Sequence, residues 1–474
     1  MAEIQYAGEF QLEECTLCTV GGLELDISKL IAEVNIYEDI FRSAISGTIS
    51  FVDTNDLLGN PEISIIGQEK LRLKLSTPNR DDTDDRNVVV NFTDTPLHIF
   101  KIGTKYGVNE ATDAVVLHFT TPEFIRNNHI RVVKSYEGEP SEDIIQSILR
   151  DDDLIASKKE FYYELTNNNF KLVSPNMRPF DFITTLARRC ISKEYDYSPS
   201  FLFYETTRGY FFRTLDSMMD RKNPKGVFRE VTPTEIEMRD DILSKMQSII
   251  NIETTSTTDT VSNRRRGMYG SRLILLDIFN KDYQEFDYNY LTEFDRDIHV
   301  DHYNIYGSQK APVASTAIDD YGNTIGDYPD SVLHVQMIER NATNGLFNPC
   351  WGQRSQYDYM GTDLWLQRRK SRFASLDSAL SLQITIPGNT TIQAGDLIGL
   401  DLSDEHMTGK YLIRNLHHKF TYAKGSPIHE ITMQCVRDTV RQTLPNSGVT
   451  KRNEGSSLTE KISLGSEDPS EVTF

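Results

Sequence analysis

The feature that most constrains this chain is the alternation of apolar and polar residues in short runs near its beginning. Every second residue is apolar in 23–27 and 71–75, and apolar residues or glycine recur with the same period in 45–51. A period of two places alternate side chains on one face of a strand, so each run predicts a strand with one buried face. About six such strands before residue 120 predict a small antiparallel barrel or sandwich.

The pattern changes to a mixed one between residues 121 and 230. Apolar residues of 144–149 have helical spacing, and Ser141 before them is the expected N-cap of this helix. A second helix is predicted over 178–190, because its apolar residues recur at steps of four. Residues 201–212 predict a β-hairpin. This middle part is therefore predicted to be an α+β domain.

Strand patterns return after residue 240. Residues 246–254 and 273–279 predict strands, and the arginines 264–266 between them are expected at an exposed hairpin tip or a protein contact. Residues 281–370 are irregular and rich in Tyr, Asp and Asn, which suits a contact surface or an inserted domain. Residues 373–440 predict strands again, and the polar residues after 441 predict an extended tail.

Charge and length exclude several classes of protein. The chain has 70 acidic and 50 basic residues, a net charge of −20, which argues against non-specific binding to nucleic acid or to an anionic membrane. No apolar stretch approaches the roughly 18 residues that span a bilayer. At about 150 residues per domain, the length predicts about three domains.

The cysteines predict ordinary reduced thiols. There are five, Cys15, Cys18, Cys190, Cys350 and Cys435, and an odd, sparse set does not indicate a disulfide framework. Cys15 and Cys18 have CxxC spacing, but neither a second pair nor a redox-motif context accompanies them. The start of the chain carries acids where a signal peptide has a basic region, so we expect folding in a reducing cytoplasm.

The sequence predicts no catalytic, cofactor-binding or metal-binding residue. The GxSxG, GxxxxGK[ST] and HExxH motifs are absent. His299 and His302 flank Asp301, but a metal site needs a further ligand, so we expect core or surface histidines and leave metal binding as an alternative. His417 and His418 lie in a strand pattern and should face opposite ways. The acidic run 151–153 is expected as a solvated helix end.

Several segments, in their order along the chain, resemble the baseplate central hub proteins of T-even-type contractile-tailed bacteriophages and their cyanophage relatives. No single segment is diagnostic, and the resemblance extends over about residues 20–440. The segments are NIYEDIF at 35–41, SGTISFVDTNDLL at 46–58, Pro61, IIGQE at 65–69, FTTPEF at 119–124, PNMRPFDF at 175–182, FLFYET at 201–206 and IPGNTTIQAGDLI at 386–398.

The resemblance implies an α+β, mainly β architecture with two small antiparallel β-barrels of the tail-tube type. An α+β domain and an irregular inserted domain accompany them, and the insert splits the second barrel in sequence. The expected divisions are 1–120 for the first barrel, 121–230 for the α+β domain, 231–280 and 371–440 for the second barrel, 281–370 for the insert and 441–474 for the tail.

The resemblance also implies a structural, non-enzymatic virion protein that is made in the host cytoplasm. Three copies would form a ring of six barrels that joins the six-fold tail tube to the three-fold central spike. DNA would pass through the ring without specific binding. The implied partners are further copies of the chain, the spike protein, tail-tube or tube-initiator proteins, the tape-measure protein and baseplate wedge proteins, without binding to a membrane.

Two alternatives remain open at this point. The first is a hub or spike-loading protein of another contractile injection system. The second is a polysaccharide-active enzyme or carbohydrate-binding β protein, because 70 acidic residues allow many carboxylate pairs. Under the hub interpretation, the net charge of −20 predicts an acidic ring lumen, and removal of 441–474 should preserve the fold but weaken an assembly contact.

Overall fold

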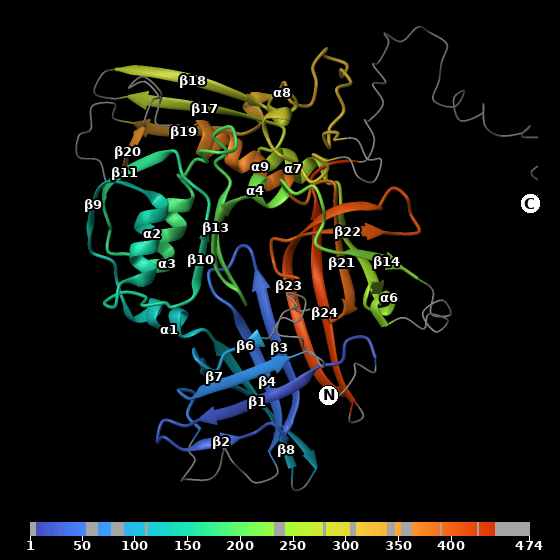
Figure 1. The fold of residues 1–474 in the computed structure, drawn as a ribbon. Coiled ribbons are helices and arrows are strands. Elements are labelled where there is room, and N and C mark those ends of the chain that lie inside the picture. Colours follow the sequence, from blue (N-terminus) through green and yellow to red (C-terminus); the bar gives the residue numbers. More distant parts are fainter. Residues whose placement is uncertain are drawn as a thin grey trace, which may run out of the picture.

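The structure is a computed structural model that describes residues 6–53, 65–76, 90–109, 112–231, 242–277, 281–303, 310–338, 347–351, 363–388, 391–423 and 426–440. Most of its elements are strands, and the longer helices lie in the middle of the chain (Figure 1). This confirms the predicted α+β, mainly β fold class. No helix within the described residues is both long enough and apolar enough to cross a membrane.

Fifteen of the described strands form one large sheet, which has two parts. We call the part made by β1–β8 the first β region, and the part made by β14–β16 and β21–β24 the second β region. The strands of the first β region are β1 (Gln11–Cys18), β2 (Glu24–Asp26), β3 (Ile31–Asp39), β4 (Ser46–Asp53), β5 (Lys70–Ser76), β6 (Val90–Asn91), β7 (Leu97–Asn109) and β8 (Thr112–Thr120). The strands of the second β region are β14 (Val227–Glu230), β15 (Ser248–Ile249), β16 (Asn251–Thr257), β21 (Leu380–Pro387), β22 (Leu397–Asp401), β23 (Gly409–Ala423) and β24 (Ser426–Arg437).

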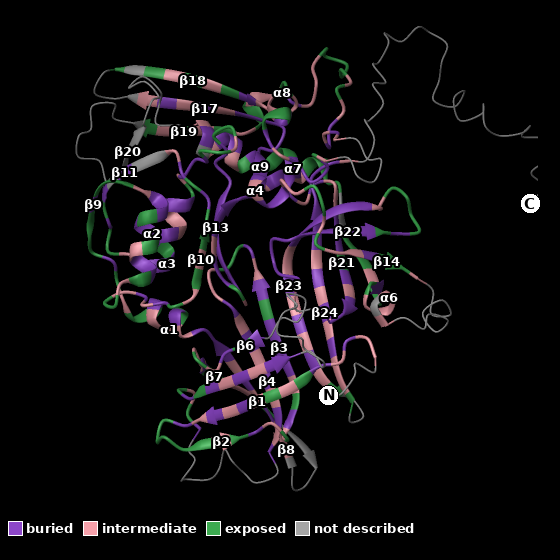
Figure 2. Cartoon of the chain, viewed as in Figure 1, coloured by how far each residue is buried: buried purple, intermediate pink, exposed green. Residues whose placement is uncertain are grey.

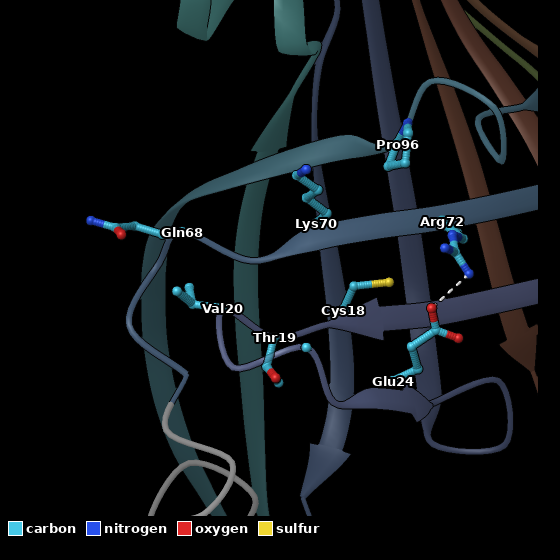
Figure 3. A pocket seen from close by; sticks show the side chains of 9 residues that line it. Cys18, Thr19, Val20, Glu24, Gln68, Lys70, Arg72 and Pro96 are labelled. Carbon is cyan, nitrogen blue, oxygen red and sulfur yellow. Dashed lines mark ion pairs between the residues drawn. The ribbon is translucent and has the colours of Figure 1, made fainter.

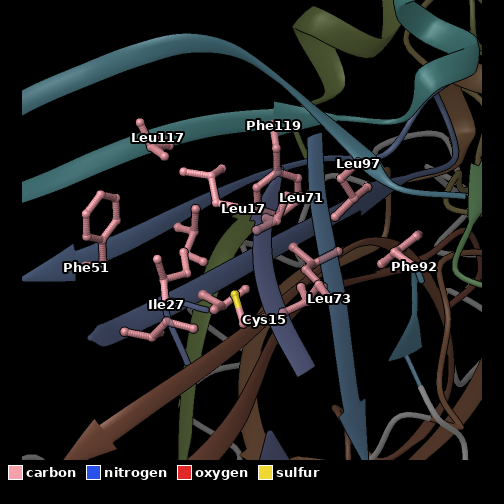
Figure 4. Packing of buried hydrophobic residues seen from close by; sticks show 14 of the residues in the cluster. Cys15, Leu17, Ile27, Phe51, Leu71, Leu73, Phe92, Leu97, Leu117 and Phe119 are labelled. Atoms are coloured by element: carbon pink, nitrogen blue, oxygen red, sulfur yellow. The ribbon is translucent and has the colours of Figure 1, made fainter. Parts of the chain in front are cut away.

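The first β region has a core of side chains from alternate strand positions, as the period of two predicts. Buried and partly exposed residues alternate along β4, and the burial colours of Figure 2 follow this alternation. Leu71 and Leu73 of β5 are fully buried, and Cys15 of β1 pairs with Leu73 inside the same cluster (Figure 4). Cys15 therefore contributes to the core as a small apolar side chain, and burial raises the pKa of its thiol.

The second β region is assembled from segments that are far apart in sequence. Strand β16 pairs with β21, so that Ile252 lies opposite Ile384 across more than one hundred intervening residues. Strands β21, β22, β23 and β24 then bury a separate apolar cluster that includes Ile398, Ile413 and Met433. The predicted strands of 373–440 are thus present, but their partners include a strand from before residue 260.

Strand β23 joins the two β regions. On one edge it pairs with β24, and on the other it pairs first with β22 at 409–412 and then with β3 at 415–421. A register shift between Ile413 and Asn415 separates these two stretches. As a result, Ile413 belongs to the core of the second β region, whereas Phe420 belongs to the core of the first.

The middle of the chain packs helices against short sheets, as expected. Helix α2 ends at Arg150, and Asp152 and Asp153 after it are exposed, as predicted for a solvated helix end. Strands β12 and β13 form the predicted hairpin. The elements are α1 (Pro122–His129), β9 (Ser135–Pro140), α2 (Ser141–Arg150), β10 (Glu160–Tyr163), β11 (Asn168–Val173), α3 (Pro179–Ala187), β12 (Phe201–Thr206), β13 (Gly209–Thr214) and α4 (Leu215–Met219).

The predicted N-cap of α2 is wrong by one residue. Pro140 occupies the N-cap position, and Ser141 is the first helical residue. The Ser141 hydroxyl accepts a hydrogen bond from Cys190 Sγ at 3.0 Å in the buried core. Its backbone N–H donates instead to Thr166 Oγ1 at 3.3 Å.

The rest of the chain forms a three-stranded sheet with helices against it. Strand β17 (Gly270–Asp277) was expected in the second barrel. It lies instead between β18 (Asp282–Asn289) and β19 (Leu333–Ile338), where Leu273 and Leu275 are buried. The region expected to be irregular therefore contains regular strands. Its elements and their neighbours are α6 (Ile242–Met246), α7 (Thr260–Arg265), β17 (Gly270–Asp277), β18 (Asp282–Asn289), α8 (Tyr290–Glu293), η1 (Phe294–Arg296), η2 (Pro329–Ser331), β19 (Leu333–Ile338), β20 (Phe347–Trp351), η3 (Leu364–Arg368) and α9 (Arg369–Ser375).

The arginines predicted at a hairpin tip lie instead in the last turn of α7 and directly after it. Asp259 caps this helix by accepting the backbone N–H of Ser262, which favours a helical turn over a β-turn at this point. Arg266 lies 3.9 Å from Asp377, and the Arg264 guanidinium lies over the Tyr328 ring. Of the three arginines, Arg266 therefore has an acidic neighbour within the chain, whereas the expected contact with another protein stays a prediction.

Candidate functional site

A surface hollow of about 480 Å³ lies beside the turn between β1 and β2 (Figure 3). Arg72 pairs with Glu24 at 3.0 Å across its mouth, and both side chains are substantially exposed. Such an exposed pair contributes at most about 1 kcal/mol. Its lining residues are Cys18, Thr19, Val20, Gly22, Glu24, Gln68, Lys70, Arg72 and Pro96. The lining residues include one thiol, Cys18, and no histidine that could act as a general base beside it.

A second hollow, of about 280 Å³, lies between the first β region and α1. Asp94 and Glu123 line it, and a carboxylate pair is what a glycoside-cleaving enzyme requires. Glu123, however, accepts a hydrogen bond from Ser157 at 2.9 Å and forms an ion pair with Lys159 at 2.9 Å. These contacts make Glu123 part of the buried structure rather than a free acid or base.

Lys159 is the centre of a buried ion-pair cluster between the first β region and the middle of the chain. Its Nζ lies 2.5 Å from Glu205 of β12 as well as 2.9 Å from Glu123 of α1. Although burial lowers the pKa of Lys159, the two carboxylates raise it overall. The Glu205 carboxylate also accepts the backbone N–H of Ile45 at 2.9 Å, which attaches the end of the loop before β4 to this cluster.

Glu38 of β3 is buried at the place where three segments meet. Its carboxylate accepts the backbone N–H groups of Thr207 at 2.8 Å and Ala394 at 3.1 Å. Among the described residues no lysine or arginine forms an ion pair with it, and burial raises its pKa to about 7. Glu38 therefore connects β3 to the β12–β13 turn and to the loop before β22.

The two histidines considered for a metal site are not brought together. His299 is buried, with Nδ1 2.8 Å from Asp438 and Nε2 2.9 Å from the Phe294 carbonyl. His302 is exposed and lies edge-on against Tyr303, and Asp301 bonds to Arg437 at 2.6 Å. The described residues contain no group of three or more His, Cys, Asp or Glu side chains placed to hold a metal ion.

His299 belongs to a second buried ion-pair cluster, which sequence reasoning missed. Arg372 of α9 lies 2.5 Å from Asp438 and 4.0 Å from Asp216 of α4. Burial alone would raise the pKa of Asp438, but His299 and Arg372 hold it well below its usual range. This cluster links α4, α9, the segment after η1 and the end of β24.

A neighbouring ion pair strengthens the same junction. Arg368, one helical turn before Arg372, pairs with Asp297 at 2.8 Å, and both side chains are buried. The feature of the sequence that could have indicated this junction is the four-residue spacing of the two arginines, which places them on one helix face. A basic run normally indicates a solvated surface, so this signal did not distinguish a buried junction from an exposed one.

His417 and His418 face opposite ways, as predicted. His417 Nε2 lies 2.6 Å from Asn35 Oδ1 and its ring stacks on Tyr37, which adds to the contact between β23 and β3. His418 is buried against His429 at 3.1 Å, and burial lowers its pKa to about 3. Cys15, Cys18, Cys190 and Cys435 are free thiols, whereas the Cys350 side chain and the predicted tail lie outside what the structure describes.

The buried ionisable groups described above thus connect the parts of the fold to one another. A nucleophile with an oriented base, or two free carboxylates facing one hollow, would be needed for hydrolysis. Neither hollow presents such an arrangement among its described lining residues. The features that stand out among the described residues are the buried ion-pair clusters around Lys159 and Arg372.

Comparison with protein-family models finds no match, and no curated protein matches this sequence. Solved structures do match. The tail protein from Neisseria meningitidis MC58 has a TM-score of 0.50 at 11% identity, over 91% of this chain and 98% of that one. The 43 kDa tail protein of prophage MuSo2 from Shewanella oneidensis has a TM-score of 0.49 at 8% identity, over 90% and 98% of the two chains. A type VI secretion component from Escherichia coli, which exhibits structural similarity to T4 bacteriophage tail proteins, has a TM-score of 0.41 at 10% identity, over 92% and 78%.

At 11% identity the first of these matches concerns the fold, and it extends over nearly the whole of both chains. It therefore includes the first β region, the middle of the chain and the second β region in one arrangement. This agrees with the fold class that the resemblance of the sequence implied. The chain therefore has the fold of the tail protein from Neisseria meningitidis MC58.

Proposed function

We propose that this chain is a structural subunit of a contractile-tail baseplate, in which three copies form the central hub between the tail tube and the spike. The observation that carries this proposal is the junction of the two β regions. A single chain offers two β regions that are joined edge to edge by β3 and β23, within a tail-protein fold.

Symmetry gives the physical reason for two such regions in one chain. Three chains match six tube subunits only if each chain presents two nearly equivalent surfaces. We assign one tube-like unit to the first β region and the other to the second. Their separate apolar clusters support this assignment, because each region has its own core.

The partners and the location follow from this role. The proposed partners are two further copies of the chain, a three-fold spike protein below and tube or tube-initiator proteins above, all within the virion. DNA crosses the ring without specific binding, and the net charge of −20 favours an acidic lumen that repels phosphates. The function needs no catalysis.

The solution mass of the purified chain tests this proposal. Light scattering should give three times the chain mass of 54.2 kDa, either for the chain alone or after addition of its spike protein. A monomer under both conditions contradicts the trimeric hub. Imaging of the trimer then tests the lumen, and a lumen lined mainly by lysine and arginine contradicts the proposed passage of DNA.

A further inference from the structure

The segment before η2 presents a large aromatic side chain to the solvent. We call residues 316–328 the knob. Within it, Ile318 is 49% exposed and Tyr321 is 85% exposed, more than any other large apolar or aromatic side chain of the described residues. Aromatic side chains offer a large contact area, and they are enriched where one protein binds another. Tyr321 is therefore placed to contact a second surface.

Hydrogen bonds hold the knob in one shape. The Asp319 carboxylate accepts the backbone N–H groups of Tyr321 at 2.9 Å and Asn323 at 3.1 Å. Asn289, the last residue of β18, donates to the Asp327 carboxylate at 2.7 Å and attaches the knob to that strand. Because the loop is already ordered in the single chain, binding through Tyr321 costs little further ordering entropy.

The knob is also acidic. Residues 316–328 contain Asp319, Asp320 and Asp327 but no lysine or arginine, so their charge is −3. Asp320 directly precedes Tyr321 and is exposed with it. A surface that receives this pair should therefore combine a depression with apolar walls and positive charge, because complementary charges favour one partner over others.

The larger hollow of the first β region has these properties (Figure 3). Val20, which is 60% exposed, and Pro96 give it apolar walls. Lys70, Arg72 and Glu24 are its charged lining residues, and two bases and one acid leave a charge of +1. Its volume of about 480 Å³ is in the range of cavities that bind a whole small molecule, so it has room for one aromatic side chain.

The knob and the hollow lie at opposite ends of the chain (Figure 1). The knob, attached to the end of β18, is at the top of this view, whereas the turn between β1 and β2 is at the bottom. The knob therefore cannot reach the hollow of its own chain, but it can reach that of another copy. A contact between two different surfaces of identical chains is head-to-tail, and such contacts form a ring when the rotation closes.

We propose that the knob of one copy docks in the hollow of the next copy. In this contact Tyr321 lies against Val20 and Pro96. Asp320 lies near Lys70. The proposal rests on the trimer of the proposed function and names the surfaces through which its copies meet. Each copy in a ring of three gives one knob and receives one, so that no hollow stays open.

Cys18 allows a direct test, because it is a free thiol that lines the hollow. The wild-type chain is coexpressed with the double variant Tyr321→Cys/Cys18→Ser and treated with a short bifunctional maleimide. A link from the new thiol to Cys18 then joins two different chains, and peptide mass spectrometry measures it. The control is Val335→Cys/Cys18→Ser, since Val335 is 56% exposed on the open face of the β18–β17–β19 sheet. We expect a several-fold higher yield for the knob variant, and equal yields overturn the proposal.

The stability of the trimer gives a second measurement. Tyr321→Ala should raise the concentration at which trimers dissociate by at least about tenfold, because a central aromatic residue carries a large share of the binding free energy. Its thermal unfolding should match the wild type, since the side chain is exposed. Asp320→Lys should also weaken the trimer, and Lys70→Glu in the same chain should restore it. Unchanged dissociation for Tyr321→Ala overturns the docking.

The outcomes separate this contact from the hub function. A wild-type trimer that Tyr321→Ala does not weaken disproves the contact and leaves the hub function standing. A chain that stays monomeric with and without the spike protein overturns both. If the trimer forms only with the spike protein, the same variants are measured in that complex. Links from the knob thiol to the spike protein in place of Cys18 would assign the knob to the spike and overturn the contact between copies.

Discussion

The first and second β regions use strands of the same kind, but the chain builds them in different ways. All strands of the first lie between Gln11 and Thr120, although β1 pairs with β5 and β4 with β8 across intervening strands. The second combines segments around 227–257 with segments around 380–437. The first region can therefore form within the first 120 residues, whereas the second brings residues before 257 to residues after 380. Contacts of the second region are slower to form, because a longer intervening loop must close first.

The two regions also differ in what surrounds their cores. The apolar cluster of the first region takes its buried members from residues 10–119, and Phe420 of β23 is the exception. The second region ends at a cluster of buried charges, where Arg437 pairs with Asp301 and Arg372 with Asp438. Buried ion pairs add little net stability but disfavour alternative arrangements. We interpret them as the means by which a discontinuous region is held in one position.

The largest effect is expected from Phe420→Ala in the shared strand. This change leaves a cavity in the first core, and it removes the contact of Phe420 with the Phe10 ring, whose centroid lies 5.2 Å away. We expect a loss of about 4 kcal/mol in the free energy of unfolding, measured by chemical denaturation. Phe92→Ala, directly after β6 in the core of the first region only, is the matched control. If β23 joins the two regions, Phe420→Ala lowers the unfolding temperature of both, and an effect on one region alone contradicts this.

A somewhat smaller effect is expected from Asp438→Asn. This change removes the negative charge beside Arg372 and His299, and leaves Arg372 with Asp216 at 4.0 Å. We expect a loss of about 3 kcal/mol, because a buried cation loses its main partner. Asp401→Asn, which breaks the exposed pair with Arg229, should change the free energy of unfolding by less than about 0.5 kcal/mol. Equal effects in the two variants would show that the buried cluster has no special role.

Glu38 gives a pH dependence to the junction of the two regions. Burial raises its folded-state pKa to about 7, above the unfolded value of 4.5. Its contribution is therefore fully present below pH 4.5 and is lost as the pH rises through 7. Between pH 5 and 7.5, the wild type should lose about 2 kcal/mol relative to Glu38→Gln. Exposed Glu24→Gln should follow the wild-type curve, and a constant difference for Glu38→Gln would disprove the raised pKa.

The smallest effect is expected at the edge-to-edge contact itself. Asn35→Ala removes the hydrogen bond between Asn35 Oδ1 and His417 Nε2, which is 2.6 Å long. The change also removes the bonds that Asn35 Nδ2 donates to Glu33 at 2.6 Å and to Thr48 at 3.2 Å. We expect a total loss of about 1 kcal/mol in calorimetry, because all three bonds are only partly buried. Asn251→Ala, which removes an exposed bond to Glu253, is the control and should be nearly neutral. A neutral Asn35→Ala would mean that backbone pairing alone joins β3 to β23.

The sequence predicted the elements better than the junctions between them. The alternation at 71–75 predicted β5, the helical spacing of 144–149 predicted α2, and the hairpin at 201–212 is present. The position of β17 was wrong, because its alternation shows that one face is buried but not which strands lie beside it. The burial of Arg368 was not predicted, because a run of basic residues has the same sequence whether it lies on the surface or in a buried ion-pair cluster.

By itself, the sequence determined that the whole is mainly β, and it placed strands such as β5 and helices such as α2 together with the buried face of each. These properties depend on residues within a few positions of one another, and local periodicity records them. Only the tertiary structure decided that β23 serves two cores, that Arg372 meets Asp438, and that one face of the β18–β17–β19 sheet stays open. Each of these depends on contacts between distant segments, whose free energy is set by burial and by the partner that the fold supplies.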